Sequence, residues 1–155
     1  MNQVANLLRQ SELFVGLPDE KIAQILSIGQ SRSYRAGETI ISEGDPSDEL
    51  YVVEKGMVEV LVPTLADIPG TIGLTAVVQL GRGQVFGEMA LVDQGARSAT
   101  IRCVQEGTAL FVIPRDAFWS LCEEDHHIGY VVMHNIARDL SFKLRHRNLP
   151  RGARE

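Results

Sequence analysis

Short runs of β-favouring residues alternate with turn residues from residue 30 to residue 113, and this alternation constrains the fold more than any other feature. The turns carry glycines such as Gly37, Gly44 and Gly56, since a tight turn often needs a positive φ that other residues resist. About eight short strands at this spacing predict an antiparallel sandwich or barrel, and the pattern leaves a jelly roll and an open barrel undecided. The expected strands cover residues 33–35, 39–41, 50–53, 58–62, 74–80, 84–86, 98–104 and 109–113, with a looser segment over 63–73.

Helical patterns flank this β-rich region on both sides. We expect N-terminal helices over residues 3–10 and from Pro18 to residue 28, because proline suits the first helical position and Gly29 is a natural stop. We expect a short helix over 114–122 and a long C-terminal helix over 127–147. The fold class is therefore mainly β with flanking helices. We expect one domain over residues 1–149 and a disordered tail over 150–155.

The long C-terminal helix carries more apolar surface than packing on one edge of a β domain requires. Its apolar side chains recur every four residues, and further apolar residues widen the stripe. We therefore expect a homodimer through this helix, because surplus exposed apolar area favours a partner. The stripe consists of Ile128, Val132, Ile136, Leu140 and Leu144, widened by Val131, Met133 and Ala137.

The charge of the chain is unevenly distributed. The net charge is −5, but residues 138–155 hold six basic and two acidic residues, a net charge of +4, so the rest carries −9. An acidic body argues against a general nucleic-acid surface. The basic end suits either a solvated helix terminus or contact with a phosphate backbone or an acidic partner.

Composition favours a cytoplasmic protein. No apolar run reaches the length of a membrane span, and the N-terminus lacks the basic start and apolar core of a signal peptide. Cys103 and Cys122 are the only cysteines and form no CxxC pair, so we expect two reduced, packed thiols.

The stretch FGEMALVDQGARSATI, residues 86–101, carries the strongest functional signal. An apolar strand ends at Phe86 and Gly87-Glu88, a single helical turn follows, and a polar loop leads to Arg97 and Ser98 at the start of another strand. A helix start offers backbone N–H groups, and a returning arginine adds a planar fork of donors. This combination predicts a site for one phosphate. Glu88 fits beside a phosphate if its carboxylate meets a neutral donor such as a sugar hydroxyl.

This stretch resembles the phosphate-binding cassette of the cyclic nucleotide-binding domain family, as in the catabolite activator protein and the regulatory subunits of cyclic-AMP-dependent kinase. The stretch YRAGETIISEGDPSDELYVVEKGMVEVLV, residues 34–62, matches the first half of the same domain. The resemblance covers about residues 8–144. It implies a double-stranded β-helix, the jelly-roll β-roll, and a receptor that binds 3′,5′-cyclic AMP, or with lower preference cyclic GMP.

The resemblance also implies a role for each residue of the cassette. Glu88 accepts a hydrogen bond from the ribose 2′-hydroxyl, and Arg97 pairs with the exocyclic phosphate oxygens. Ser98 leaves cyclic AMP favoured without securing it. The remaining expected site residues are Phe86 at the start of the motif, and Gly87, Met89 and Ala90, which with Ser98 supply backbone or hydroxyl donors.

The base is usually capped from the long C-terminal helix in this family. Phe142, Lys143 and Leu144 lie near the matching level, where small hydroxyl residues are common in cyclic-AMP regulators. Because none of these three is a small hydroxyl residue, the family pattern does not fix which base the chain selects. Phe142 is expected either to stack on the purine or to pack in a helix–helix contact, and Lys143 is expected beside it.

The expected output is a change in the C-terminal helix that an unidentified partner protein reads. We expect the hinge at residues 123–126, because three consecutive acids favour solvent. The chain ends where transcription factors of this superfamily continue into a DNA-reading domain, so we expect no sequence-specific DNA binding. The alternative is a ligand-free interaction module of the same fold, with a buried ion pair between Arg97 and Glu88.

The sequence favours neither an enzyme nor a metal protein. No Ser/His/Asp or paired-carboxylate arrangement stands out. All four histidines lie in or beside the last helix, and two cysteines are too few for a four-thiolate cluster. We therefore expect no catalytic residues, no metal and no cofactor other than the nucleotide ligand.

Overall fold

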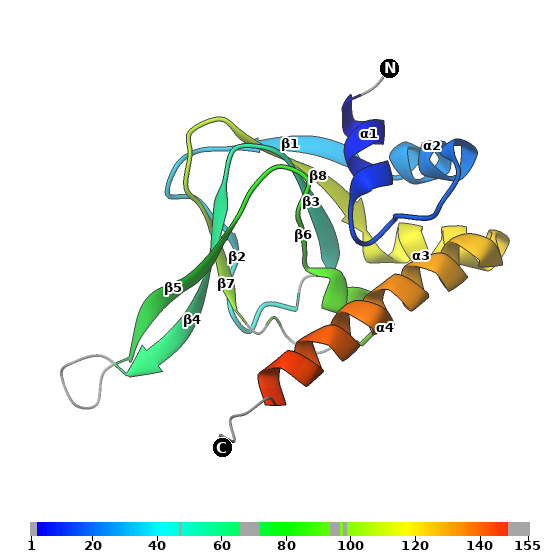
Figure 1. Ribbon diagram of the computed structural model, residues 1–155. Helices are drawn as coiled ribbons and strands as arrows, with labels where there is room; N and C mark the ends of the chain where they lie inside the picture. Colours follow the sequence, from blue (N-terminus) through cyan, green and yellow to red (C-terminus); the bar gives the residue numbers. More distant parts are fainter. Residues whose placement is uncertain (1–2, 47, 66–71, 94–96, 98, 149–155) are drawn as a thin grey trace.

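The computed structural model describes residues 3–46, 48–65, 72–93, 97 and 99–148. Within these residues, eight antiparallel strands form two four-stranded sheets, and the helices gather toward one end of the roll (Figure 1). The predicted mainly β fold with flanking helices is confirmed. The first sheet has the order β1 (Gln30–Tyr34), β8 (Thr108–Pro114), β3 (Glu49–Lys55) and β6 (Val85–Phe86). The second has the order β2 (Thr39–Ile41), β7 (Thr100–Cys103), β4 (Val58–Leu65) and β5 (Ile72–Leu80).

The helices begin and end close to the expected positions. Pro18 and Pro114 directly precede α2 and α3 as N-cap residues in extended conformation, one position before the first helical residue. Proline is compatible with such a start because the first N–H groups of a helix have no partner within it. The helices are α1 (Gln3–Gln10), α2 (Asp19–Ser27), the short 3₁₀ helix η1 (Glu88–Leu91), α3 (Arg115–Glu124) and α4 (His126–Asn148).

The two faces of the first sheet pack against two different cores. On strand β3, Leu50 and Val52 point toward the helices, whereas Tyr51 and Val53 point into the roll. Successive side chains of a strand alternate between faces, so one apolar strand serves both cores. Inside the roll they meet side chains of the second sheet such as Ile101.

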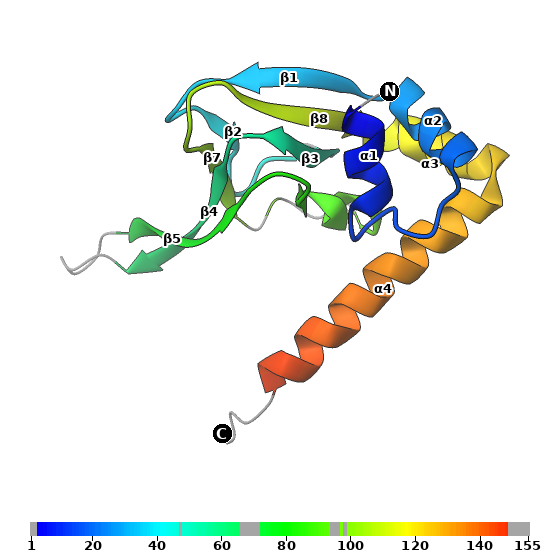
Figure 2. The same cartoon turned by 45° about the horizontal axis from the view of Figure 1, so that its top comes forward.

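Helix α4 buries one face over its first half and is largely exposed over its second half. Ile128 and Val132 are fully buried and Ile136 nearly so, whereas Leu144 is 58% exposed. Figure 2 shows why: the first half lies against α3 and the α1–α2 region, and the C-terminal half extends away from the helices. The expected stripe is thus divided, because its first three members complete the core of this chain.

Two strand boundaries differ by three residues from the sequence prediction, and the others differ by less. Strand β1 begins at Gln30, three residues before the expected start, because the polar segment pairs with β8 from Gln30 opposite Val112. The segment over 63–73 is expected to be loose, but its described residues belong to strands: β4 continues to Leu65, which pairs with Ile72 of β5. Residues 66–71 lie outside the described residues. Ladder hydrogen bonds of a long hairpin arm here outweigh the local proline and glycine signals.

The junction between α3 and α4 is tighter than the expected hinge. Asp125 alone separates the two helices. Its carboxylate forms an ion pair with Lys21 of α2 and accepts a hydrogen bond from the backbone N–H of His127 at 3.1 Å. Glu123 and Glu124 are exposed, as expected, but Asp125 is partly buried. The expectation of a solvated acidic hinge is therefore wrong for Asp125, because a lysine from another helix and the start of α4 both use its carboxylate.

Candidate functional site

The cassette begins with a turn that requires glycine. Strand β6 ends at Phe86, whose ring stacks on Tyr51 of β3 with 4.7 Å between centroids and 5° between planes. Gly87 follows with a φ of +83°. A Cβ at Gly87 would lie 2.8 Å from the carbonyl oxygen of Glu49 and 3.2 Å from Nη1 of Arg97. The positive φ and the close approach of β3 therefore both exclude a larger side chain here.

The single turn after Gly87 is anchored by its apolar residues. Ala90 and Leu91 of η1 are buried, and Leu91 belongs to the core beneath the helices. The backbone N–H of Ala90 donates to the carbonyl of Gly87 at 3.2 Å, which closes the turn. Met89 is 45% exposed. The turn thus holds Gly87 and Glu88 in place through its own core contacts.

Arg97 returns to the start of the cassette, as the sequence predicts. Its guanidinium donates from Nη1 to the carbonyl of Gly87 at 3.3 Å and from Nη2 to the carbonyl of Glu49 at 2.6 Å. Its backbone is held as well, because its N–H donates to the carbonyl of Asp45 at 3.0 Å and its carbonyl accepts from the N–H of Gly44 at 2.8 Å. Ser98, the expected hydroxyl donor, lies outside the described residues.

The side chain of Glu88 turns toward α4. It lines a small hollow together with Glu12, Leu13, Val85, Asn135 and Asp139. Burial raises the pKa of Glu88, as do the nearby carboxylates of Asp139 and Glu12, whereas a backbone hydrogen bond and the charge of Lys143 partly oppose this. Glu88 and Arg97 are thus directed to different partners. The interaction that defines the ligand-free alternative, an ion pair between these two, is not the arrangement described here.

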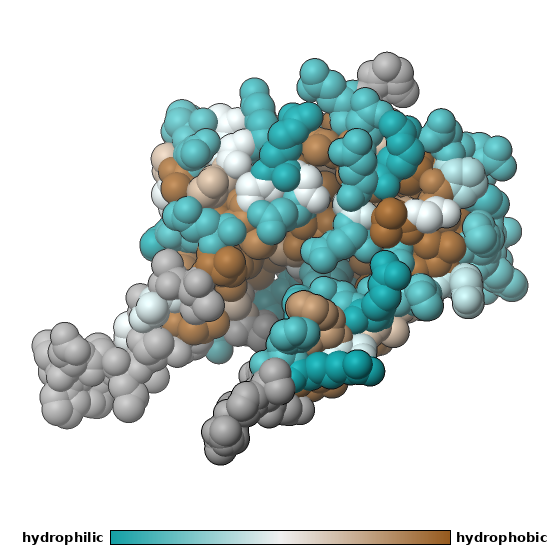
Figure 3. Space-filling view, viewed as in Figure 1, coloured by the Kyte–Doolittle hydropathy of each residue, from teal (hydrophilic) through white to brown (hydrophobic). Residues whose placement is uncertain are grey.

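The expected base-capping residues lie on the exposed half of α4. Phe142 is 59% exposed, and its ring centroid lies 3.9 Å from that of His146. Lys143 forms an ion pair with Asp139 one turn earlier, 3.0 Å between Nζ and Oδ2. Burial alone would lower the pKa of Lys143, but Asp139 and Glu88 raise it. Figure 3 shows the surface hollowed between the roll and this part of α4.

Three contributors to this region were missed by sequence reasoning. Buried Asn135 donates to the carbonyls of Leu13 and Val15, at 2.9 and 3.0 Å, and so ties α4 to the loop beside Glu88. Asp139 faces the same hollow. Glu49 supplies the carbonyl for Arg97. Only Glu49 left a signal, since it is a charged residue at a position that alternates in phase with the inward-pointing Tyr51 and Val53 of the same strand.

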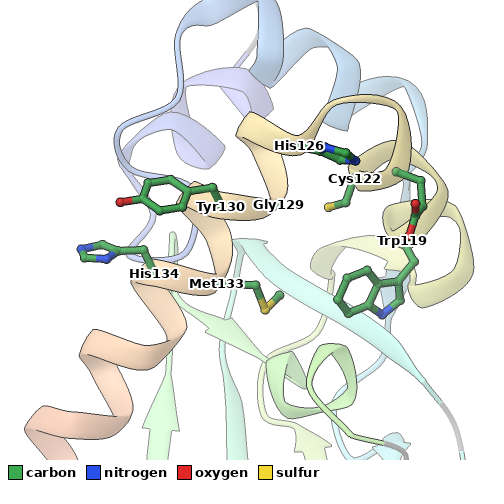
Figure 4. A pocket seen from close by; sticks show the side chains of 8 residues that line it. Trp119, Cys122, His126, Gly129, Tyr130, Met133 and His134 are labelled. Carbon is green, nitrogen blue, oxygen red and sulfur yellow. The ribbon is translucent and has the colours of Figure 1, made fainter.

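A second pocket lies between α3 and the first half of α4, and no cassette residue lines it. It has a volume of about 550 Å³ and is mostly apolar. Figure 4 shows Met133 of α4 pointing toward Trp119 of α3, with Cys122 between the two helices. Tyr130, which is 68% exposed, stacks with His134 on α4 at 6.1 Å between centroids. Burial raises the pKa of Cys122 to about 11, and neighbouring acids add to this, so its thiol is protonated at neutral pH.

Neither a metal-binding cluster nor a membrane-spanning helix is found in the part of the chain that the structure describes. There, no group of three or more His, Cys, Asp or Glu side chains is arranged to hold a metal ion. Among the same residues, no helix combines the length and apolarity needed to cross a membrane.

Comparison with known proteins identifies the family. Residues 31–125 match the model of the cyclic nucleotide-binding domain. The cyclic AMP receptor protein of Thermus thermophilus is 34% identical over 142 residues, which are 92% of this chain and 61% of that protein. Human cGMP-dependent protein kinase 2 is 33% identical over 117 residues, 75% of this chain and 15% of the kinase. The crystal structure of the Thermus thermophilus catabolite activator protein superposes with a TM-score of 0.76 at 34% identity, covering 90% of this chain and 61% of that one.

The chain therefore belongs to the cyclic nucleotide-binding domain family, of the type found in the catabolite activator protein and in kinase regulatory domains. It spans less than two thirds of the length of these relatives.

Proposed function

We propose that this member of the family is a receptor for 3′,5′-cyclic AMP, with cyclic GMP as the less favoured ligand, and that it acts by binding and not by catalysis. The observation that carries the proposal is the position of Arg97 at the start of the cassette, with its guanidinium against the carbonyl of Gly87. A planar guanidinium beside a glycine turn suits a singly charged phosphodiester, which offers two exocyclic oxygens to a fork of donors.

The proposed site comprises Phe86, Gly87, Glu88, Met89, Ala90, Arg97 and Ser98 from the cassette, and Phe142 and Lys143 from α4. Arg97 binds the phosphate and Glu88 accepts from the ribose 2′-hydroxyl. Because Phe142 is exposed and Lys143 lies on the same exposed half of α4, both are accessible to a base that projects from the cassette.

The preference for cyclic AMP draws on two relatives whose names point in different directions. The bacterial relative, similar over nearly the whole chain, is a cyclic AMP receptor protein, whereas the kinase relatives are cGMP-dependent. Similarity to the first extends over 92% of this chain, against 75% for the human kinase. This breadth, which must reach into α4, supports cyclic AMP.

We further propose that α4 transmits the signal to a partner protein. Glu88 is the link, because it belongs to the cassette and lies in the hollow formed with Asn135 and Asp139 of α4. A ribose hydroxyl that attracts Glu88 would take it from this hollow and so favour a different position of α4. Hydrogen exchange tests this: exchange in residues 126–148 should change with cyclic AMP, whereas protection confined to residues 86–98 would contradict transmission.

Homodimerisation through α4 belongs to the same proposal. Tyr130, Phe142 and Leu144 are each more than half exposed, and the apolar pocket beside Met133 extends this surface. Light scattering at micromolar concentration should give the mass of two chains. A single-chain mass with and without nucleotide would contradict the dimer.

The remaining proposals concern the cellular location of the protein, the extent of its domain and DNA recognition. We propose a cytoplasmic receptor, since Cys103 and Cys122 are both free and buried. We propose residues 1–149 as the receptor domain and no base-specific reading of DNA by this domain itself.

Calorimetric titration with cyclic AMP and with cyclic GMP tests the proposed function. We expect one nucleotide per chain and tighter binding of cyclic AMP. The matched control is 5′-AMP, whose dianionic, open phosphate should bind more weakly. If neither cyclic nucleotide gives heat or a thermal shift, the receptor proposal fails and the ligand-free interaction module replaces it.

A further inference from the structure

Glu49 contacts two arginines with two different parts of the residue. Its backbone carbonyl accepts the 2.6 Å hydrogen bond from Nη2 of Arg97. Its carboxylate accepts two hydrogen bonds from Arg32, from Nη1 at 3.2 Å and from Nη2 at 2.9 Å, and a third from the hydroxyl of Tyr51 at 2.9 Å. The side chain and the main chain of one residue thus serve different arginines.

This network lies on the inner face of the first sheet. Arg32 stands opposite Leu110 of β8, and Glu49 shares its face of β3 with Tyr51. Both Leu110 and Tyr51 belong to the core inside the roll. Because β8 lies between β1 and β3, the ion pair of Arg32 and Glu49 spans an intervening strand.

An ion pair at this position needs a reason beyond stability. Removing two charges from water costs free energy that their attraction often fails to offset. The pair is partly buried, with exposed side-chain fractions of 38% for Arg32 and 25% for Glu49. Replacing such a pair by apolar residues is often neutral or stabilising, so stability alone does not account for an ion pair beside Arg97.

Glu49 is ionised, and the charges of both arginines stabilise its carboxylate. Burial alone would raise its pKa, but the hydrogen bonds from Arg32 and Tyr51 and the charges of Arg32 and Arg97 hold it below its usual value. A carboxylate near Arg97 is a potential rival of a phosphate for the same guanidinium.

We propose that Arg32 is a positioning residue for nucleotide binding: it holds the carboxylate of Glu49 in a bidentate ion pair, so that this carboxylate does not compete with the cyclic phosphate for Arg97. The inference rests on the proposed function. In this arrangement Glu49 steadies Arg97 through its neutral carbonyl, while its charge is directed to β1.

The test is a double-mutant cycle read by cyclic AMP titration. R32M releases the carboxylate and should weaken binding by about tenfold, which corresponds to about 1.4 kcal/mol. E49Q alone removes the rival charge with Arg32 in place and should lose less affinity than R32M. The double variant R32M/E49Q should recover most of the loss, although it lacks the ion pair altogether.

A matched control is available on the other sheet. Arg102 of β7 pairs with Glu59 of β4 at 2.7 Å, with exposed fractions of 41% and 16%. Neighbouring Ile101 and Cys103 are the buried residues of β7, so Arg102 points away from the interior of the roll. R102M should therefore leave cyclic AMP affinity unchanged while breaking a comparable pair.

The outcomes separate the two proposals. A wild-type protein that binds neither cyclic nucleotide overturns the proposed function. A wild-type protein that binds, with R32M unchanged, overturns only the role of Arg32. A double variant as weak as R32M also overturns it, because a purely structural defect is not rescued by E49Q. If R32M fails to fold, R32K, which keeps the charge without the bidentate geometry, is compared with R32K/E49Q on the same criterion.

Discussion

Replacing Glu88 with glutamine should stabilise the protein and weaken its ligand binding at the same time. Glu88 lies in a hollow with Glu12 and Asp139, and burial with these like charges raises its pKa in the folded state. Between its ordinary pKa and this raised value, the unfolded chain ionises first, so stability falls as pH rises through that interval. Above that interval the folded protein bears the full free-energy cost of the buried Glu88 carboxylate, and E88Q removes this cost.

The size of the effect follows from what Glu88 contacts. Burying an incompletely compensated polar group costs about 1–3 kcal/mol, and attraction to Lys143 places Glu88 at the low end. A gain of about 1 kcal/mol should raise Tm by about 2–4 °C in a chain of this size. A hydrogen bond to a charged acceptor contributes about 1–1.5 kcal/mol more than a hydrogen bond between neutral groups. Because E88Q makes the acceptor of the ribose hydroxyl neutral, cyclic AMP affinity should fall by about five- to tenfold.

Thermal unfolding between about pH 4 and pH 8, with and without cyclic AMP, measures both effects. E124Q is the control, because Glu124 is exposed at the end of α3 and should change stability by less than about 0.5 kcal/mol. A destabilised E88Q, or one whose stability gain does not depend on pH, would refute the reasoning about this hollow.

Three further substitutions test the rest of the site. R97L should reduce cyclic AMP affinity at least about tenfold, because it removes charge-assisted bonds of about 1.5–3 kcal/mol each; undiminished affinity in calorimetry would exclude Arg97 from the site. G87A should lower Tm by about 4–8 °C in thermal unfolding, since positive φ and the 2.8 Å approach to the Glu49 carbonyl together cost about 2 kcal/mol or more; an unchanged Tm would contradict the required glycine. K21M should flatten the acid side of the profile of stability against pH. The hydrogen bond from Lys21 lowers the pKa of Asp125, so the stability that this pair contributes is present above the ordinary pKa and is lost as pH falls through the lowered one. A profile identical to that of the wild type would show that the pair does not contribute.

The cassette turn and its arginine could be predicted from the sequence because their signals are local. The glycine at position 87, the helical turn and Arg97 lie within eleven residues, and chemistry alone suggested a phosphate site. The structure brings Arg97 to the carbonyl of Gly87. The direction of Glu88 toward α4 was not predictable, since it depends on Asn135 and Asp139, which follow some fifty residues later in the chain.

The sequence predicts the β fold class, but it predicts the ends of individual strands less well. Turn residues divide the strands clearly, but β1 begins in a polar segment that only its pairing with β8 makes a strand. The sequence also did not predict that α4 divides into a half that packs on the core and a half that is exposed. Ile128 and Leu144 occupy the same helical stripe, yet one is fully buried and the other 58% exposed, because the helix extends past the body it packs on.

The structure of the complex with cyclic AMP tests the central claim most directly. The account predicts exocyclic phosphate oxygens about 2.8 Å from the guanidinium of Arg97, and the carboxylate of Glu88 withdrawn from the hollow beside Asn135 to meet the ribose 2′-hydroxyl. A nucleotide bound elsewhere, or one whose phosphate does not contact Arg97, would contradict it.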